Sequence, residues 1–263
     1  MNMTPAQLEA SNLLTEIFLR FNSRTAAVLS FRIVASYGVR YAVRKVEANS
    51  SDFAKKLCSD PEFEGLFTNR SSFFENIGGV DGLAGLMTAR TVEDFEKAVD
   101  AASLVFTHSI LDDASLGYCR VAAIVSPQDW EKFVIKKQIS LEDVKSVKAS
   151  SFEEILKNKV FEYIDKDLEN QSLLFKVDRL YEICQPPTDF SGIKDYKFDR
   201  DHLKKLDDLR HDIVHGEGPV KKLPNGERDI EYLQKTTIHL LTLVNFKYDV
   251  KINPLGLPKF FKS

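Results

Sequence analysis

Apolar residues recur at spacings of three and four along most of this chain, the pattern of amphipathic helices. The first such stretch follows Thr4-Pro5, and a threonine placed before a proline is typical of a helix start. The longest stretch runs from Thr91 to Val125 with a single glycine and no proline, and Thr91 with Asp94 has the spacing of a capping box. We therefore predict a helix in each of these two stretches.

The same pattern predicts further helices, and these occupy residues 26–46, the stretch after Ser126-Pro127, the stretch from Ser150 or Ser151 to Ile164, residues 168–184, the residues leading to Gly216, and the stretch after an Asp229 cap. Residues 26–46 would also suit strands, because they contain many β-branched and aromatic residues. The prediction is an all-α fold, a helical bundle with an additional N-terminal helical segment. We divide the chain into an N-terminal segment (1–89), a helical domain (90–250) and a C-terminal tail (251–263).

Composition narrows the class of protein only modestly. The chain has 263 residues, 43% hydrophobic and 29% charged, with a formal net charge of -3, which is ordinary for a soluble globular protein. Nucleic-acid binding would therefore need a local basic patch. The three cysteines form no CxxC pair, which favours a reducing compartment over a zinc ribbon. Neither a signal-peptide pattern nor an apolar run of about 18 residues is present, so we expect a cytoplasmic protein without a membrane partner.

Residues 207–216, DDLRHDIVHG, concentrate groups suited to phosphate chemistry. Arg210 offers a fixed positive fork that matches phosphate oxygens. His211 and His215, two of only five histidines, can each take or give a proton near neutral pH. Gly216 predicts the end of the helix, in the left-handed conformation that glycine adopts readily.

An arginine, a polar residue and then a histidine a few residues later, on a helix of an all-α bundle, resembles the signature of the HEPN superfamily. Arg210, His211 and His215 match that signature residue by residue, and the resemblance covers roughly residues 90–250. It implies metal-independent RNA cleavage, often in a toxin or antiviral defence role, by a homodimer in which two motifs face each other. An antitoxin or a regulatory protein is a further partner that it implies. Glu217 stands where one subset of the family has a modified tyrosine, so that modification is not expected here.

The chemistry can also be argued from the residues. RNA cleaves itself when its 2'-hydroxyl attacks the adjacent phosphorus, and this step needs a base, an acid and positive charge on the phosphorane. We assign His215 as the general base or acid, Arg210 as the group that stabilises the phosphate, and His211 as an orienting or assisting group, with no metal and no cofactor. One histidine cannot easily be both base and acid, which favours two copies in one site. On an ideal helix, residues 210 and 215 lie about 140° apart, so the long arginine or a frayed last turn must bring them together.

Four lysines flank the motif and are the candidates for RNA binding, although surface solubility explains them equally well: Lys204, Lys205, Lys221 and Lys222.

Several other hypotheses remain open at this stage. The motif could be purely structural, with the two histidines interacting favourably with the negative end of the helix dipole and Arg210 paired with Asp207 or Asp208. Alternatively, the domain could bind a partner without catalysis. His211-Asp212-x-x-His215 is also one methylene short of a zinc-hydrolase motif, and it would need a third ligand such as His239 or Glu231. The His211-Asp212 doublet would suit a phosphohydrolase if His108 and Asp229 joined it, but His108 is more typical of a satisfied core residue.

Overall fold

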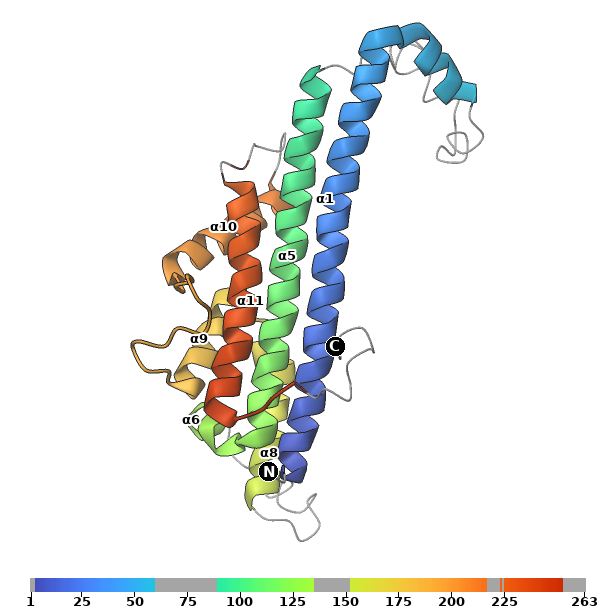
Figure 1. Ribbon diagram of the computed structural model, residues 1–263. Coiled ribbons are helices and arrows are strands. Elements are labelled where there is room, and N and C mark those ends of the chain that lie inside the picture. Colours follow the sequence, from blue (N-terminus) through green and yellow to red (C-terminus); the bar gives the residue numbers. More distant parts are fainter. Residues whose placement is uncertain (1–2, 60–88, 135–151, 217–222, 224, 253–263) are drawn as a thin grey trace. The chain divides into compact units, whose positions relative to one another are not determined.

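The structure is a computed structural model that describes residues 3–59, 89–134, 152–216, 223 and 225–252. Within these ranges all regular secondary structure is helical, which confirms the predicted all-α class (Figure 1). The elements are α1 (Pro5–Ser59), α5 (Ala89–Val125), the 3-10 helix η1 (Pro127–Trp130), α6 (Glu131–Val134), α8 (Phe152–Tyr163), the π-helical η2 (Ile164–Leu168), α9 (Leu173–Cys184), α10 (Arg200–His215) and α11 (Gly226–Tyr248).

Two compact units are formed, and neither is continuous in sequence. The first comprises residues 1–26, 104–216 and 227–263, and the second comprises 27–103 and 217–226. Helices α1 and α5 each contribute to both units. Because the units interleave along the chain, they do not test the boundary expected between residues 89 and 90, which stays a prediction.

In the first unit, the second half of α5 contacts four other helices. A Cβ atom on Gly117 would overlap the Ile17 side chain, so the glycine allows α1 to approach α5 closely. The Tyr118 hydroxyl donates a hydrogen bond to the Thr237 carbonyl oxygen of α11 at 3.2 Å. Side chains of α5 also bind residues of α9 and α10, and these polar contacts form the site described below. The core contains many fully buried side chains, among them Leu14, Leu104, Leu111, Trp130, Leu168, Leu180 and Leu233.

The second unit contains the rest of α1 and the first turns of α5. Arg32 pairs with Asp100 at 2.9 Å, and Arg40 pairs with Glu96, so ion pairs join the two helices. The same part of α1 exposes large apolar side chains, namely Leu29, Phe31, Ile33, Val34, Tyr37 and Tyr41.

The start of α1 is the one predicted from Thr4-Pro5. The Thr4 hydroxyl accepts a hydrogen bond from the Gln7 amide at 3.2 Å, and the Gln7 side-chain oxygen accepts one from the Thr4 amide at 3.0 Å. This reciprocal pair is a capping box. The expectation of a separate helix over residues 26–46 is wrong, because α1 runs unbroken to Ser59. Residues 6–59 contain no proline and only Gly38, so nothing in the backbone ends the helix earlier.

Three other predicted helix starts are also corrected. Thr91 lies inside α5, which as described begins at Ala89, and Asp229 lies in the first turn of α11 instead of capping it. The helix expected over 168–184 begins only at Leu173, because Ser172 caps it by accepting a hydrogen bond from the Phe175 amide at 3.3 Å. This last correction matters for function, because Ser172 lines a pocket.

Candidate functional site

Helix α10 positions the motif residues. Asp199 caps its start by accepting a hydrogen bond from the His202 amide at 3.0 Å, and Leu203 and Leu206 bury one face of the helix in the core. The helix ends at His215, as predicted, but Gly216 is extended (φ -69°, ψ 139°) and not left-handed. A Cβ atom on Gly216 would overlap the Asp212 carbonyl oxygen, which accepts a hydrogen bond from the Gly216 amide at 2.7 Å. Glycine is therefore needed here for close approach and not for a positive φ.

The three motif residues face different surroundings. His211 and His215 are exposed, with their ring centroids 4.7 Å apart, whereas Arg210 is half-buried and lines a pocket. Within the described part of the chain, no hydrogen bond, ion pair or ring contact joins Arg210 to either histidine. The angle of about 140° between positions 210 and 215 accounts for this separation, because the helix stays regular up to His215.

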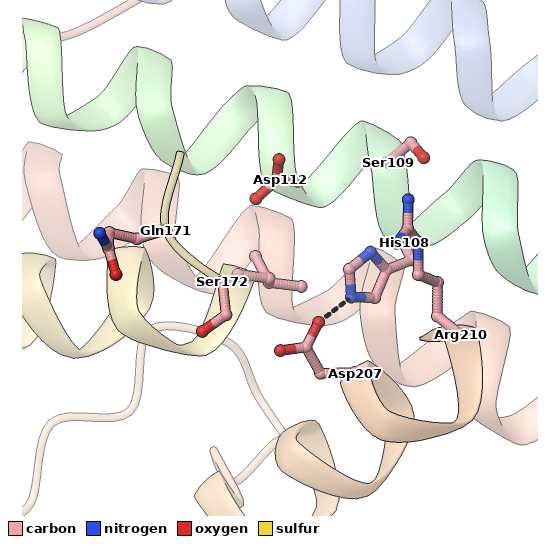
Figure 2. Close-up of a pocket in the computed structure, with 8 residues that line it drawn as sticks. His108, Ser109, Asp112, Gln171, Ser172, Asp207 and Arg210 are labelled. Atoms are coloured by element: carbon pink, nitrogen blue, oxygen red, sulfur yellow. Dashed lines mark hydrogen bonds and ion pairs between the residues drawn. The ribbon is translucent and has the colours of Figure 1, made fainter. Parts of the chain in front are cut away.

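The pocket lies between three helices and holds about 170 Å³ (Figure 2). Its lining is mostly polar: His108, Ser109 and Asp112 from α5, Gln171, Ser172 and Leu173 at the start of α9, and Asp207 and Arg210 from α10.

His108 is buried in one wall of this pocket, with an exposed fraction of 5%. Its Nε2 atom lies 2.9 Å from Oδ1 of Asp207 (Figure 2). His108 is therefore buried, as expected of a core residue, with a partner at Nε2 that the sequence did not indicate. The contact also engages Asp207, one of the two carboxylates that the sequence offers as partners for Arg210.

Arg210 extends from α10 toward α5, beside the ring of His108 (Figure 2). Its Nε atom is buried and has no hydrogen-bond partner in the described ranges, nor does the guanidinium form an ion pair there. A buried donor left without a partner costs roughly 1–3 kcal/mol, and more when the group is charged. An anion bound in the pocket would supply the guanidinium with the negative charge that it lacks.

A buried lysine of α9 binds one of the carboxylates that line the pocket. Lys176 is 2% exposed, and its Nζ lies 2.8 and 2.9 Å from the two carboxylate oxygens of Asp112. The Lys176 charge is therefore already compensated. Arg210 is the cationic pocket residue that remains available to an anion.

The nominated metal ligands have other partners. Among the described residues, no three His, Cys, Asp or Glu side chains are grouped to hold a metal ion. His239 is 3% exposed and lies 2.6 Å from the Tyr181 hydroxyl, and Glu231 pairs with Lys235 at 2.7 Å. The zinc hypothesis thus gains no third ligand in this part of the chain.

The phosphohydrolase hypothesis needs His108 and Asp229 together with the doublet at 211 and 212. Asp229 instead lies 3.3 Å from His202, and His108 is bound to Asp207. His108 and Asp229 therefore each contact a residue outside the doublet at 211 and 212.

Of the four lysines proposed to bind RNA, Lys204 and Lys205 are exposed on α10. Lys221 and Lys222 lie outside the described residues.

No family model, curated protein or solved structure matches this chain. No described helix is long and apolar enough to cross a membrane. The likeness to the HEPN superfamily therefore depends on the motif at residues 210–215 and on its helical setting.

Proposed function

We propose that this protein is a metal-independent endoribonuclease of the HEPN type. The observation that supports the proposal best is the guanidinium of Arg210, which lines a polar pocket without an ion-pair partner among the described residues. A cation partly removed from water in this way interacts more strongly with a phosphodiester than a fully solvated one does. His211 and His215 follow on the same helix with exposed rings.

In the proposed reaction, the RNA 2'-hydroxyl attacks the adjacent phosphorus, Arg210 stabilises the charge that develops, and His215 exchanges a proton with the substrate. Because His215 does not line the pocket that Arg210 lines, we propose that a homodimer brings it to the Arg210 of the other copy. Lys204 and Lys205 would hold the RNA backbone. The setting we infer is toxin or antiviral defence in the cytoplasm, with an antitoxin or regulatory protein as a further partner.

The second candidate is a HEPN-like module that binds a partner without catalysis. One observation favours it: within a single chain, Arg210 contacts neither histidine. The two candidates differ in whether the purified protein cleaves RNA.

The deciding experiment incubates the wild-type protein and single variants with single-stranded RNA in the presence of a metal chelator. We expect Arg210→Ala and His215→Ala each to lower the rate at least 100-fold, because each removes a group needed in the transition state. Arg200→Ala is the matched control, since Arg200 lies on the same helix but pairs with Asp178 at 2.6 Å. Circular dichroism should show equal helicity in all four proteins.

The products should end in a 2',3'-cyclic phosphate, and a substrate with a 2'-deoxy sugar at the cleavage site should be inert. Light scattering should find a dimer. If no RNA is cleaved, or if the Arg210→Ala and His215→Ala variants cleave as fast as the wild type, the binding-module alternative replaces the proposal.

A further inference from the structure

The pocket beside Arg210 contains a histidine–carboxylate pair that is not part of the motif. His108 comes from α5 and Asp207 from α10, ninety-nine positions apart in sequence, and their contact is 2.9 Å. Asp207 and Arg210 are three residues apart on α10, so both side chains can reach α5 from one side of the helix. Figure 2 shows the His108 ring between these two side chains.

The contact with Asp207 determines which atom of His108 is available for chemistry. A carboxylate accepts a hydrogen bond, so Nε2 of a neutral His108 must bear the proton, and Nδ1 then has a free lone pair. Nδ1 makes no hydrogen bond to any residue in the described ranges. The arrangement is that of a general base whose tautomer is fixed by a carboxylate, and that carboxylate also stabilises the imidazolium that forms when the base takes a proton.

The neighbours of His108 fit the same role. Lys176 donates hydrogen bonds to both carboxylate oxygens of Asp112, so its ammonium group is not engaged with the Nδ1 lone pair of His108. Arg210 has no ion-pair partner among the described residues and would hold a phosphate next to the ring. Burial excludes most of the water that would otherwise compete for the proton.

We propose that His108, held by Asp207, is the general base that deprotonates the 2'-hydroxyl of an RNA phosphodiester bound by Arg210. This inference rests on the proposed ribonuclease function. The bond from the 2'-oxygen to phosphorus forms and the bond from phosphorus to the 5'-oxygen breaks. His108 gains the 2'-hydroxyl proton, and a protonated His215 of the other copy gives its proton to the departing 5'-oxygen. Asp207 is a positioning residue, and no external reactant is consumed.

The test compares RNA cleavage by the full-length wild type, His108→Gln and Asp207→Asn. Glutamine keeps an amide that can donate to Asp207, so a purely structural role predicts near-normal rates, whereas loss of the base predicts a kcat lower by about 100- to 10,000-fold. Asp207→Asn should lower kcat with little change in KM, because an amide can favour the wrong tautomer. It also tests the pair if His108→Gln does not fold. His202→Gln is the matched control, since it alters a second His–Asp pair, His202 of α10 with Asp229 of α11 at 3.3 Å, that does not line the pocket.

A second substrate separates base from acid. With sulfur in place of the 5'-bridging oxygen, the leaving group needs no proton, so cleavage by His215→Ala should recover while His108→Gln stays impaired. Recovery by His108→Gln would overturn its assignment as the base. If Arg210→Ala and His215→Ala are inactive but His108→Gln cleaves like the wild type, the inference fails and the ribonuclease proposal stands. If the wild type cleaves no RNA, both fail.

Discussion

Acidification should destabilise this protein in part through His239. The side chain is 3% exposed, and burial lowers the pKa of His239 below its ordinary value. Its Nε2 lies 2.6 Å from the Tyr181 hydroxyl, while Nδ1 is buried without a hydrogen-bond partner in the described ranges. Protonation would place a charged N–H at Nδ1 where no acceptor is available, so the folded state keeps the ring neutral.

The size of the effect follows from the difference in bound protons. In the unfolded chain, a histidine takes up a proton below about pH 6.5, whereas the folded protein does not until a lower pH. The contribution is therefore fully present above pH 6.5 and is lost as the pH falls toward the folded pKa. Within that window, the loss approaches about 1.4 kcal/mol per pH unit for one proton.

The assay is urea denaturation at pH 7.5, 6.0 and 5.0, comparing the wild type with a Tyr181→Phe/His239→Phe double variant. The double variant removes the titrating ring and also the hydroxyl that would lose its partner. Other titrating groups are shared, so the difference between the two pH slopes isolates His239. We expect the wild type to lose more stability than the variant between pH 6.0 and 5.0, by at most about 1.4 kcal/mol. Parallel slopes would refute the argument that the ring is neutral in the folded state.

Two further predictions concern the packing of the first unit and are checked by the same denaturation assay. Gly192→Ala should lower the free energy of unfolding by about 1–3 kcal/mol, because its Cβ atom would overlap the Thr242 hydroxyl. Asp112→Ala should cost about 3 kcal/mol, since it leaves the 2%-exposed Lys176 without its counter-ion. The neighbouring Asp113→Ala should cost no more than about 1 kcal/mol, because the described partners of Asp113 are the exposed Arg20 and Arg24. Equal costs for the two aspartates would contradict this account.

The helical class could be predicted from sequence because the spacing of apolar residues is a property of each helix by itself. The continuity of α1 was not predicted, because residues 26–46 have many side chains that also suit strands. The absence of proline from residues 6–59, with Gly38 their single glycine, is nevertheless compatible with one helix. The interruption before α9 was also missed. The apolar residues Leu168 and Leu173 stand on either side of the break, so only the cap at Ser172 marks the new start.

The candidate site could likewise be predicted from the sequence only in part. Arg210, His211 and His215 could be nominated because they are adjacent in sequence and share a chemical logic. His108 gave no comparable signal, because a single histidine between Phe106 and Ile110 is more typical of a core. Its pairing with Asp207 depends on how α5 packs against α10, which no local pattern encodes.

The geometry of α10 connects the two parts of the proposal. Positions 210 and 215 lie about 140° apart on this regular helix, and Arg210 lines the pocket whereas His215 does not. If the motif alone were the active site, the motif would supply a cation to the pocket and no base there. His108 supplies a base on the Arg210 side, and the exposed His215 is left free to act on a second copy. Each active site would then take its base and its phosphate-binding arginine from one chain and its acid from the other.

It follows that mixing Arg210→Ala with His215→Ala protein should restore up to about one quarter of wild-type activity if the subunits exchange freely. In a mixed dimer, one site has both defects and the other has neither. No recovery, in mixtures shown by light scattering to contain exchanged dimers, would exclude a site shared in this way.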